Sequence, residues 1–106
     1  MSTTSTHVDL THHFIEQLDA GKFQEATRSF DATVAGLLNA DALSSLWAQL
    51  QSEGGKFQEQ RDARSSTYGE HDVVFFTLRH ETRNFEGYVA YDHDHKIAGL
   101  AFAPLD

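Results

Sequence analysis

The sequence predicts an α+β domain in which N-terminal helices pack on one face of a curved antiparallel sheet of about four strands. Apolar residues recur at helical spacing in the first half of the chain and alternate with period two in the second half. If residues 83–84 form a two-residue turn, the apolar residues of the two strands beside it fall on one common face. We therefore expect a single domain over residues 1–106, with residues 1–6 as a flexible tail.

Three helices are expected in the first half of the chain. The first begins at Thr6, whose hydroxyl can cap it, and ends at Gly21. Its apolar residues fall within one arc of the helical wheel: Val8, Leu10, Phe14, Ile15 and Leu18. The second helix runs from Lys22 to Leu38, with a break at Gly36.

The third helix is capped by Asn39 or Asp41 and ends at the two consecutive glycines of residues 54–55. Its apolar residues follow the spacing i, i+3, i+4, i+7: Leu43, Leu46, Trp47 and Leu50.

Four strands are expected after the helices. The polar stretch of residues 56–68 is typical of an edge strand, and residues 69–70 form a tight turn into a central pair. This pair covers residues 73–82 and 85–91, and a last strand over residues 97–103 is ended by a proline.

The two expected turns also predict which residues face each other across the sheet. In the central pair the facing residues are Thr82 and Phe85, His80 and Gly87, Leu78 and Val89, and Phe76 and Tyr91. Extended to the edge strand, the same logic places Glu59 opposite His80.

The opposite face of the predicted sheet is also apolar, at Val73, Phe75, Tyr88 and Ala90. Ala98, Leu100 and Phe102 are expected to join it, depending on the bend at Gly99. Because monomers rarely expose so large an apolar patch, we expect a homodimer that pairs through this outer sheet face. The alternatives are that a terminal segment or loop covers the face, or that another protein docks there.

Composition excludes several classes of function. The formal charge is −8, from 8 basic and 16 acidic residues, so binding to nucleic acid or to an anionic membrane is not expected. The chain has no cysteine, no apolar stretch long enough for a membrane span and no visible signal peptide, which favours a cytoplasmic location. No phosphate-binding loop, nucleophile elbow or serine triad is present, and we expect no cofactor.

Several short motifs resemble one small family. They are Phe30-Asp31, Leu43-x-x-Leu46-Trp47-x-x-Leu50, Gly55-Lys56-Phe57, Val89-x-Tyr91-Asp92 and Lys96-Ile97-Ala98-Gly99-Leu100-x-Phe102-x-Pro104. The family is that of the domain of unknown function 3887, within the nuclear-transport-factor-2-like group. This resemblance implies a cone of helices and curved sheet around a pocket, dimers through the outer sheet face, and frequent fusion ahead of hydrolase domains. The wider group includes ketosteroid isomerase-like enzymes and pure binding modules, but the matching motifs carry no catalytic role.

Candidate site residues follow from the predicted faces. Residues that line a ligand cavity, or simply fill the core, are Phe30, Trp47, Phe76, His80 and Tyr91. In an alternative enzymatic hypothesis His80 is a general base and Glu59 orients it, as in isomerases or cyclases. Residues 93–95 and 12–13 carry histidines, but neither set converges as zinc requires, so no metal site is predicted.

The sequence thus favours a small, non-enzymatic accessory or assembly domain that holds a small apolar molecule in its cavity. The isomerase- or cyclase-like enzyme is the alternative.

Overall fold

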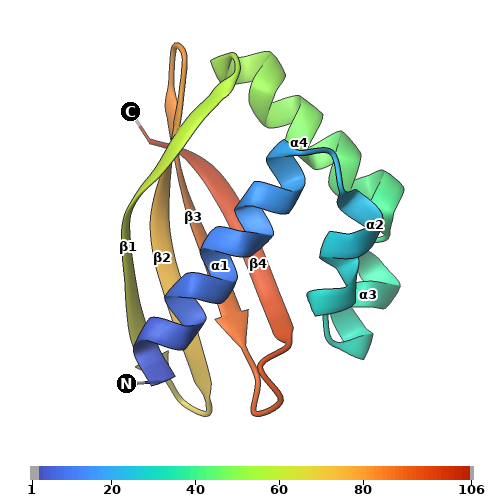
Figure 1. Ribbon diagram of the computed structural model, residues 1–106, viewed down its shortest axis with the longest axis vertical. Helices are drawn as coiled ribbons and strands as arrows, with labels where there is room; N and C mark the ends of the chain where they lie inside the picture. The colour runs from blue at the N-terminus through green and yellow to red at the C-terminus, as the bar shows by residue number, and fades with distance from the viewer. Residues whose placement is uncertain (1–2, 106) are drawn as a thin grey trace.

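The computed structural model describes residues 3–105 and confirms an α+β fold with the helices first and a four-stranded antiparallel sheet after them. The elements are α1 (Thr3–Asp19), α2 (Phe23–Ala26), the 3₁₀ helix η1 (Thr27–Ser29), α3 (Ala32–Leu37), α4 (Ala40–Gly54), β1 (Phe57–Tyr68), β2 (His71–His80), β3 (Asn84–Tyr91) and β4 (Ile97–Leu105). The strands lie in the order β1-β2-β3-β4. Figure 1 shows α1 crossing the sheet, with the other helices gathered toward its β4 side.

Helix α1 begins at Thr3, so residues 3–6 are helical and not the tail that we predicted. Residues 1–2 of that predicted tail lie outside the described part of the chain. The buried stripe of α1 also differs from the predicted arc, because it includes two polar residues and leaves Leu10 38% exposed. Its buried members are His7, Thr11, Phe14, Ile15 and Leu18.

The predicted second helix is interrupted at Phe30 and not at Gly36. Phe30 is extended, with φ −78° and ψ 147°, because Asp31 begins a new helix. The Asp31 Oδ1 accepts a hydrogen bond from the Val34 N–H at 2.8 Å, and the Asp31 N–H donates to the Ile97 carbonyl at 2.9 Å. These two bonds cap α3 and fasten it to the start of β4.

Helix α4 confirms the predicted third helix. The Asn39 Oδ1 accepts a hydrogen bond from the Ala42 N–H at 2.8 Å, and the helix ends at Gly54. Gly55 follows with φ +83°, a conformation that glycine adopts without the steric penalty of a Cβ. The chain then turns sharply into β1.

Strands β2 and β3 have the predicted faces but not the predicted register. Leu78 and Val89 both point into the core and are fully buried. However, Leu78 lies opposite Phe85, and Gly87 lies opposite Phe76 and not opposite His80. The turn contains residues 80–83, and its backbone hydrogen bonds to residues 54–56 explain the difference.

Three hydrogen bonds hold that turn against the link between α4 and β1. The Glu81 N–H donates to the Lys56 carbonyl at 3.1 Å, and the Thr82 N–H donates to the Gly54 carbonyl at 2.8 Å. In return, the Lys56 N–H donates to the Glu81 Oε1 at 2.7 Å. A two-residue turn at residues 83–84 would leave these groups in the wrong place.

The β1–β2 pair follows the predicted register only near its turn. Tyr68 lies opposite His71, and Arg64 lies opposite Phe75, as the two-residue turn at residues 69–70 requires. Between Arg61 and Arg64 the strand carries a bulge, in which Asp62 has φ +57°. The extra residue reverses which side chains point inward as far as Glu59, and a second register shift between Phe57 and Glu59 turns Phe57 back toward the core.

Strand β4 adds to the core and not to the outer apolar patch that we predicted for Leu100 and Phe102. Leu100 lies opposite Val89, and Phe102 lies opposite Gly87, so both face the core. A register shift between Ala90 and Tyr91 lets the side chains of Leu100 and Phe102 lie on the core side of β4. The outer face of β4 therefore presents Gly99, Ala101 and Ala103.

The core lies between the helices and the inner face of the sheet. Its largest fully buried side chains include Tyr91, Phe14, Phe76, Phe85, Ile15 and Leu18. None of the helices within residues 3–105 combines the length and the apolar character needed to cross a bilayer.

Candidate functional site

The structure buries His80 deep in the domain, with 3% of the residue exposed. Its Nδ1 lies 2.8 Å from the Gly55 carbonyl oxygen, and because a carbonyl only accepts, Nδ1 carries the proton. The Nε2 of the neutral ring is then an acceptor, and it has no hydrogen-bond partner. Trp47, Phe57 and Phe85 surround the ring, with centroid distances of 5.0–5.9 Å.

Glu59 does not meet His80, so the predicted acid–base pair is wrong. Beyond the β1 bulge Glu59 lies opposite Arg79, and Phe57 takes the place opposite His80. The Glu59 carboxylate is exposed and pairs with Arg61 at 3.3 Å. The one-residue insertion at Asp62 is the physical reason, because side chains alternate along a strand.

The other predicted ligand-binding residues belong to the core cluster. Phe30, Trp47, Phe76 and Tyr91 are 6%, 3%, 0% and 2% exposed. Phe76 packs over Gly87, where an added Cβ would lie 2.6 Å from the Phe76 Cε2. The four side chains thus fill the space between the helices and the sheet in this structure.

Tyr91 and Thr11 form a buried hydroxyl chain. The Thr11 hydroxyl donates to the His7 carbonyl at 2.8 Å, so its oxygen is left to accept from the Tyr91 hydroxyl, also at 2.8 Å. Burial raises the pKa of Tyr91 to about 12, although the hydrogen bond to Thr11 opposes this shift. The Tyr91 proton is therefore retained at neutral pH and engaged inside the protein.

His7 is a buried polar residue that the sequence analysis missed. Its ring stacks on Tyr91 at a centroid distance of 4.7 Å, and its Nε2 lies 2.9 Å from the Nδ1 of His95. On the other side, its Nδ1 lies 3.4 Å from an Asp72 carboxylate oxygen. Desolvation lowers the pKa of His7, Asp72 opposes that shift, and His95 adds to it.

The spacing of α1 carried a signal for this cluster. His7 and Thr11 extend the stripe of Phe14 and Leu18 by steps of three and four residues, which is the period of a helix face. The turn before β4 completes the cluster, because His95 has φ +61° and its N–H donates to the Asp92 carbonyl at 3.1 Å. None of the clefts described below is lined by these residues, so we assign the cluster a role in joining α1 to the sheet.

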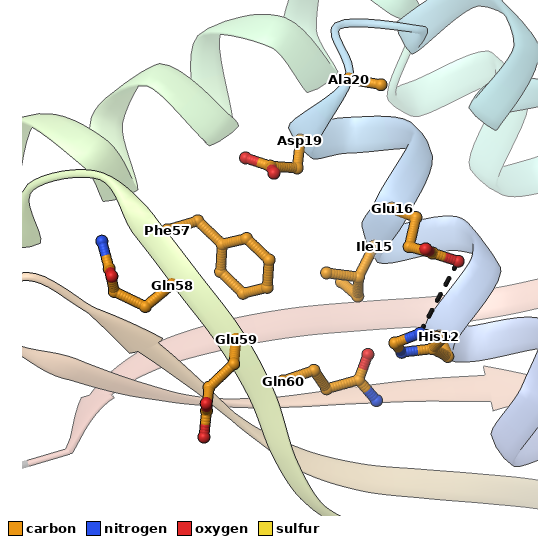
Figure 2. A pocket seen from close by; sticks show the side chains of 9 residues that line it. All are labelled: His12, Ile15, Glu16, Asp19, Ala20, Phe57, Gln58, Glu59 and Gln60. Atoms are coloured by element: carbon orange, nitrogen blue, oxygen red, sulfur yellow. Dashed lines mark ion pairs between the residues drawn. The ribbon is translucent and has the colours of Figure 1, made fainter.

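A cleft of about 380 Å³ lies between α1 and the edge strand β1 (Figure 2). Its lining residues are His12, Ile15, Glu16, Asp19, Ala20, Phe57, Gln58, Glu59 and Gln60. In Figure 2 Phe57 and Gln60 extend from β1 toward α1, whereas Glu59 points away from the helix. Ile15 faces them from α1 and supplies, with Phe57, the apolar part of the wall.

The polar part of this α1–β1 cleft is acidic. Glu16 and Asp19 lie on the α1 side, and none of the nine lining residues is Lys or Arg. His12 lies 3.7 Å from Glu16 in an exposed pair, four residues apart on the same helix. The Oε1 of Gln60 is buried and has no hydrogen-bond partner.

The outer sheet face carries a ladder of aromatic residues. Tyr68, Phe75 and Tyr88 follow one another at centroid distances of 6.0 and 6.3 Å, and Val73 lies beneath them with 7% exposed. Tyr68 and Tyr88 are 59% and 39% exposed. Two apolar hollows mark this surface, of about 210 Å³ beside Val73 and about 170 Å³ beside Ala101 and Ala103.

Charges on the outer face are nearly balanced. Its paired strand positions carry the cations Arg61, Arg64 and Arg79 and the anions Glu59 and Glu86. The formal charge of these positions is +1, although the whole chain carries −8. Arg64 lies 5.6 Å from the Phe75 ring centroid and 3.7 Å from Glu86, so the charges border the aromatic ladder.

Within residues 3–105 no group of three or more His, Asp or Glu side chains is arranged to hold a metal ion. His93 and His95 share a turn, but His95 is directed toward His7.

The chain resembles known proteins over most of its length. The model of the family described as "Protein of unknown function (DUF3887)" matches residues 12–100. The chain is also 26% identical, over 89 residues, to "Esterase EstD" of Thermotoga maritima. That match covers 84% of this chain but only 22% of the esterase, so the chain spans about a fifth of that relative's length. No solved structure gives a significant match.

Proposed function

We propose that this chain, which belongs to the DUF3887 family of proteins of unknown function, is a non-catalytic accessory domain that pairs with a second copy of itself. The pairing surface is the outer sheet face, defined by Tyr68, Val73, Phe75 and Tyr88 with the small residues of β4 beside them. The observation that carries the proposal is the aromatic ladder on a face that none of the helices within residues 3–105 covers (Figure 1).

Burial of this ladder supplies the driving force for pairing. Aromatic side chains dominate interface energetics, and Phe75 is only half-buried within one copy. The alanines and glycine on the outer face of β4 leave room for the side chains of a facing sheet. Two sheets that stack in this way lie roughly 10 Å apart.

Charge selects the outer face over the other surfaces. Two molecules of charge −8 repel each other, and the repulsion is least where the local charge is near zero. The outer face, at +1, is such a surface, and its arginines and glutamates can pair across a two-fold axis. A second copy therefore fits this face better than it fits the acidic α1–β1 cleft.

An accessory role is supported by the partial match to the esterase. Most of that protein lies outside the matched 22%, so the resemblance favours a domain that stands beside a hydrolase. The catalytic alternative is not supported, because Glu59 points away from His80 and the Tyr91 hydroxyl donates to Thr11.

The experiment is a comparison of oligomeric state by light scattering. We expect the wild-type chain to have twice its single-chain mass of 11.9 kDa and the Phe75→Glu variant to be a folded monomer. Leu37→Glu is the matched control, because Leu37 is 81% exposed on the helical side of the domain. It should remain a dimer.

Two results would overturn the proposal. One is a wild-type chain that is monomeric at concentrations well above those typical of specific protein–protein association. The other is a Phe75→Glu variant that keeps its native circular dichroism spectrum and is still dimeric.

A further inference from the structure

We propose that the α1–β1 cleft binds a small organic cation, with a protonated amine attached to an apolar body of a few carbon atoms. This inference does not depend on pairing through the outer face, because the cleft lies on the opposite side of β1 from that surface. It rests on the cleft's volume, its charge and two unpartnered acceptors.

The charge of the cleft selects a cation. Glu16 and Asp19 line it and no Lys or Arg does. His12 already lies 3.7 Å from Glu16, so a bound ammonium group meets the Asp19 carboxylate without competition from a Lys or Arg of the cleft. Figure 2 shows the Asp19 carboxylate projecting from α1 into the space above Phe57. A carboxylate of the ligand would be repelled at the same place.

Two unpartnered acceptors select a ligand that donates hydrogen bonds. The Gln60 Oε1 is buried on the β1 side of the cleft. The His80 Nε2 is buried in the core, and its ring lies 5.7 Å from that of Phe57, which lines the cleft. Buried acceptors without a partner are uncommon in native proteins, and a donor that reaches them removes the cost of their desolvation. An ammonium group carries three such donors.

Phe57 separates the two acceptors and forms the movable part of the wall. It is half-buried, it lies opposite His80 across the β1–β2 pair, and its ring stands 5.7 Å from the His80 ring. A change of Phe57 rotamer would open the α1–β1 cleft toward the His80 ring. The ring would then pack against the apolar body of the ligand.

The volume of the cleft suits a small ligand. A space of about 380 Å³ is at the lower end of the range for small-molecule sites. The site therefore fits a single ring or a short branched chain with one amine, and it excludes nucleotides and larger cofactors.

Trp47 provides the readout. It is the single tryptophan of the chain, and its ring lies 5.5 Å from the Phe57 ring, so displacement of Phe57 should change its emission. We would titrate the protein with cyclohexylmethylamine, with cyclohexylmethanol and with cyclohexanecarboxylate, and follow Trp47 fluorescence beside equilibrium dialysis. The three compounds share a ring and differ in the charge of the polar group.

The expected order of affinity is amine, then alcohol, then carboxylate, with the carboxylate at least about tenfold weaker than the amine. Asp19→Asn should lower the affinity for the amine by about tenfold and leave the affinity for the alcohol unchanged. Gln60→Leu should weaken both the amine and the alcohol. Asp9→Asn, an exposed change on the same helix outside the cleft, is the control and should alter neither.

Asp19 is exposed, so its variant should fold and the test remains informative. Equal binding of carboxylate and amine would overturn the proposal, as would an Asp19→Asn variant with wild-type affinity for the amine. Absence of amine binding by dialysis would overturn it as well.

Discussion

At the scale of single residues, His7 and Thr11 take core positions on α1 because each finds polar partners there. Thr11 donates to the His7 carbonyl and accepts from Tyr91, and the His7 ring contacts His95 and Asp72. Buried polar groups are tolerated when they are hydrogen-bonded. These residues therefore join α1 to β2, β3 and the turn before β4.

His7 should make the stability of the fold depend on pH. Burial lowers the pKa of His7 below its ordinary value of 6.5, so the unfolded chain takes up a proton before the folded chain does as the pH falls. Stability from this residue is present above about pH 6.5 and is lost as the pH falls from there through the lower folded-state pKa. We expect the His7→Phe variant to lose less free energy of unfolding than the wild type between about pH 7.5 and about pH 5.

Urea unfolding at several pH values measures this difference. His13→Phe, a change of an exposed histidine on the same helix, is the control and should follow the wild-type curve. If the free energy of unfolding changed with pH in the same way for His7→Phe and the wild type, protonation of His7 would not be coupled to folding.

Gly87 is required by the close approach of two aromatic rings. A Cβ at this position would lie 2.6 Å from Phe76 and 2.9 Å from Phe102. We expect Gly87→Ala to lower the free energy of unfolding by about 1–3 kcal/mol, because the core would be overpacked. Gly36→Ala, at a position with no atom within 4 Å of the added Cβ, should leave stability unchanged or raise it by up to about 1 kcal/mol.

Chemical denaturation of both variants tests the assignment of Phe76 to the space above Gly87. A Gly87→Ala variant as stable as the wild type would mean that the ring does not occupy that space.

At the scale of elements, the β1 bulge decides which residues face the α1–β1 cleft. Asp62 inserts one residue between Arg61 and Arg64, which turns Glu59 outward and Gln60 inward. The conformation of Asp62, with φ +57°, is one that aspartate and glycine tolerate and β-branched residues do not.

Substitution at Asp62 should therefore affect stability according to side-chain branching. Asp62→Val is expected to lower the free energy of unfolding by about 1–2 kcal/mol, whereas Asp62→Gly should not lower it. Ser66→Val, at an exposed and regular position of the same strand, controls for the new side chain. Equal stability of Asp62→Val and Ser66→Val, measured by thermal unfolding, would argue against the bulge.

The alternation of apolar residues predicted the side of the sheet on which a β2 or β3 side chain lies better than it predicted which residues lie opposite each other. Alternation alone assigned Leu78 and Val89 to the core, because the side of a strand depends only on the parity of the position. Register depends on the turn, and the turn at residues 80–83 is held by bonds to residues 54–56, which are distant in sequence. No local signal reports such bonds.

The candidate site was less predictable than the fold. His80 was correctly placed on the inner face, but its neighbours were wrong, because two register shifts in β1, between Arg61 and Arg64 and between Phe57 and Glu59, put Phe57 where Glu59 was expected. The α1–β1 cleft depends on the distance between a helix and an edge strand, which sequence spacing does not determine. The wider resemblance to the nuclear-transport-factor-2-like group stays a prediction.

At the scale of the whole molecule, charge and apolar surface are segregated. The outer sheet face is aromatic and nearly neutral, whereas the α1–β1 cleft is acidic, so the two surfaces suit different partners. Pairing through the outer face leaves the cleft open in each copy. The two proposals, pairing through the outer face and ligand binding in the cleft, are therefore compatible with each other.

The distance between two copies tests the central proposal most directly. The chain has no cysteine, so a spin label can be placed at Ser66→Cys on the outer face or at Leu37→Cys on the helical side. In a pair joined by outer faces, stacked roughly 10 Å apart, we expect the distance between Ser66 labels to be much shorter than that between Leu37 labels. A shorter distance between the Leu37 labels, or no dipolar coupling at Ser66, would contradict pairing through the outer face.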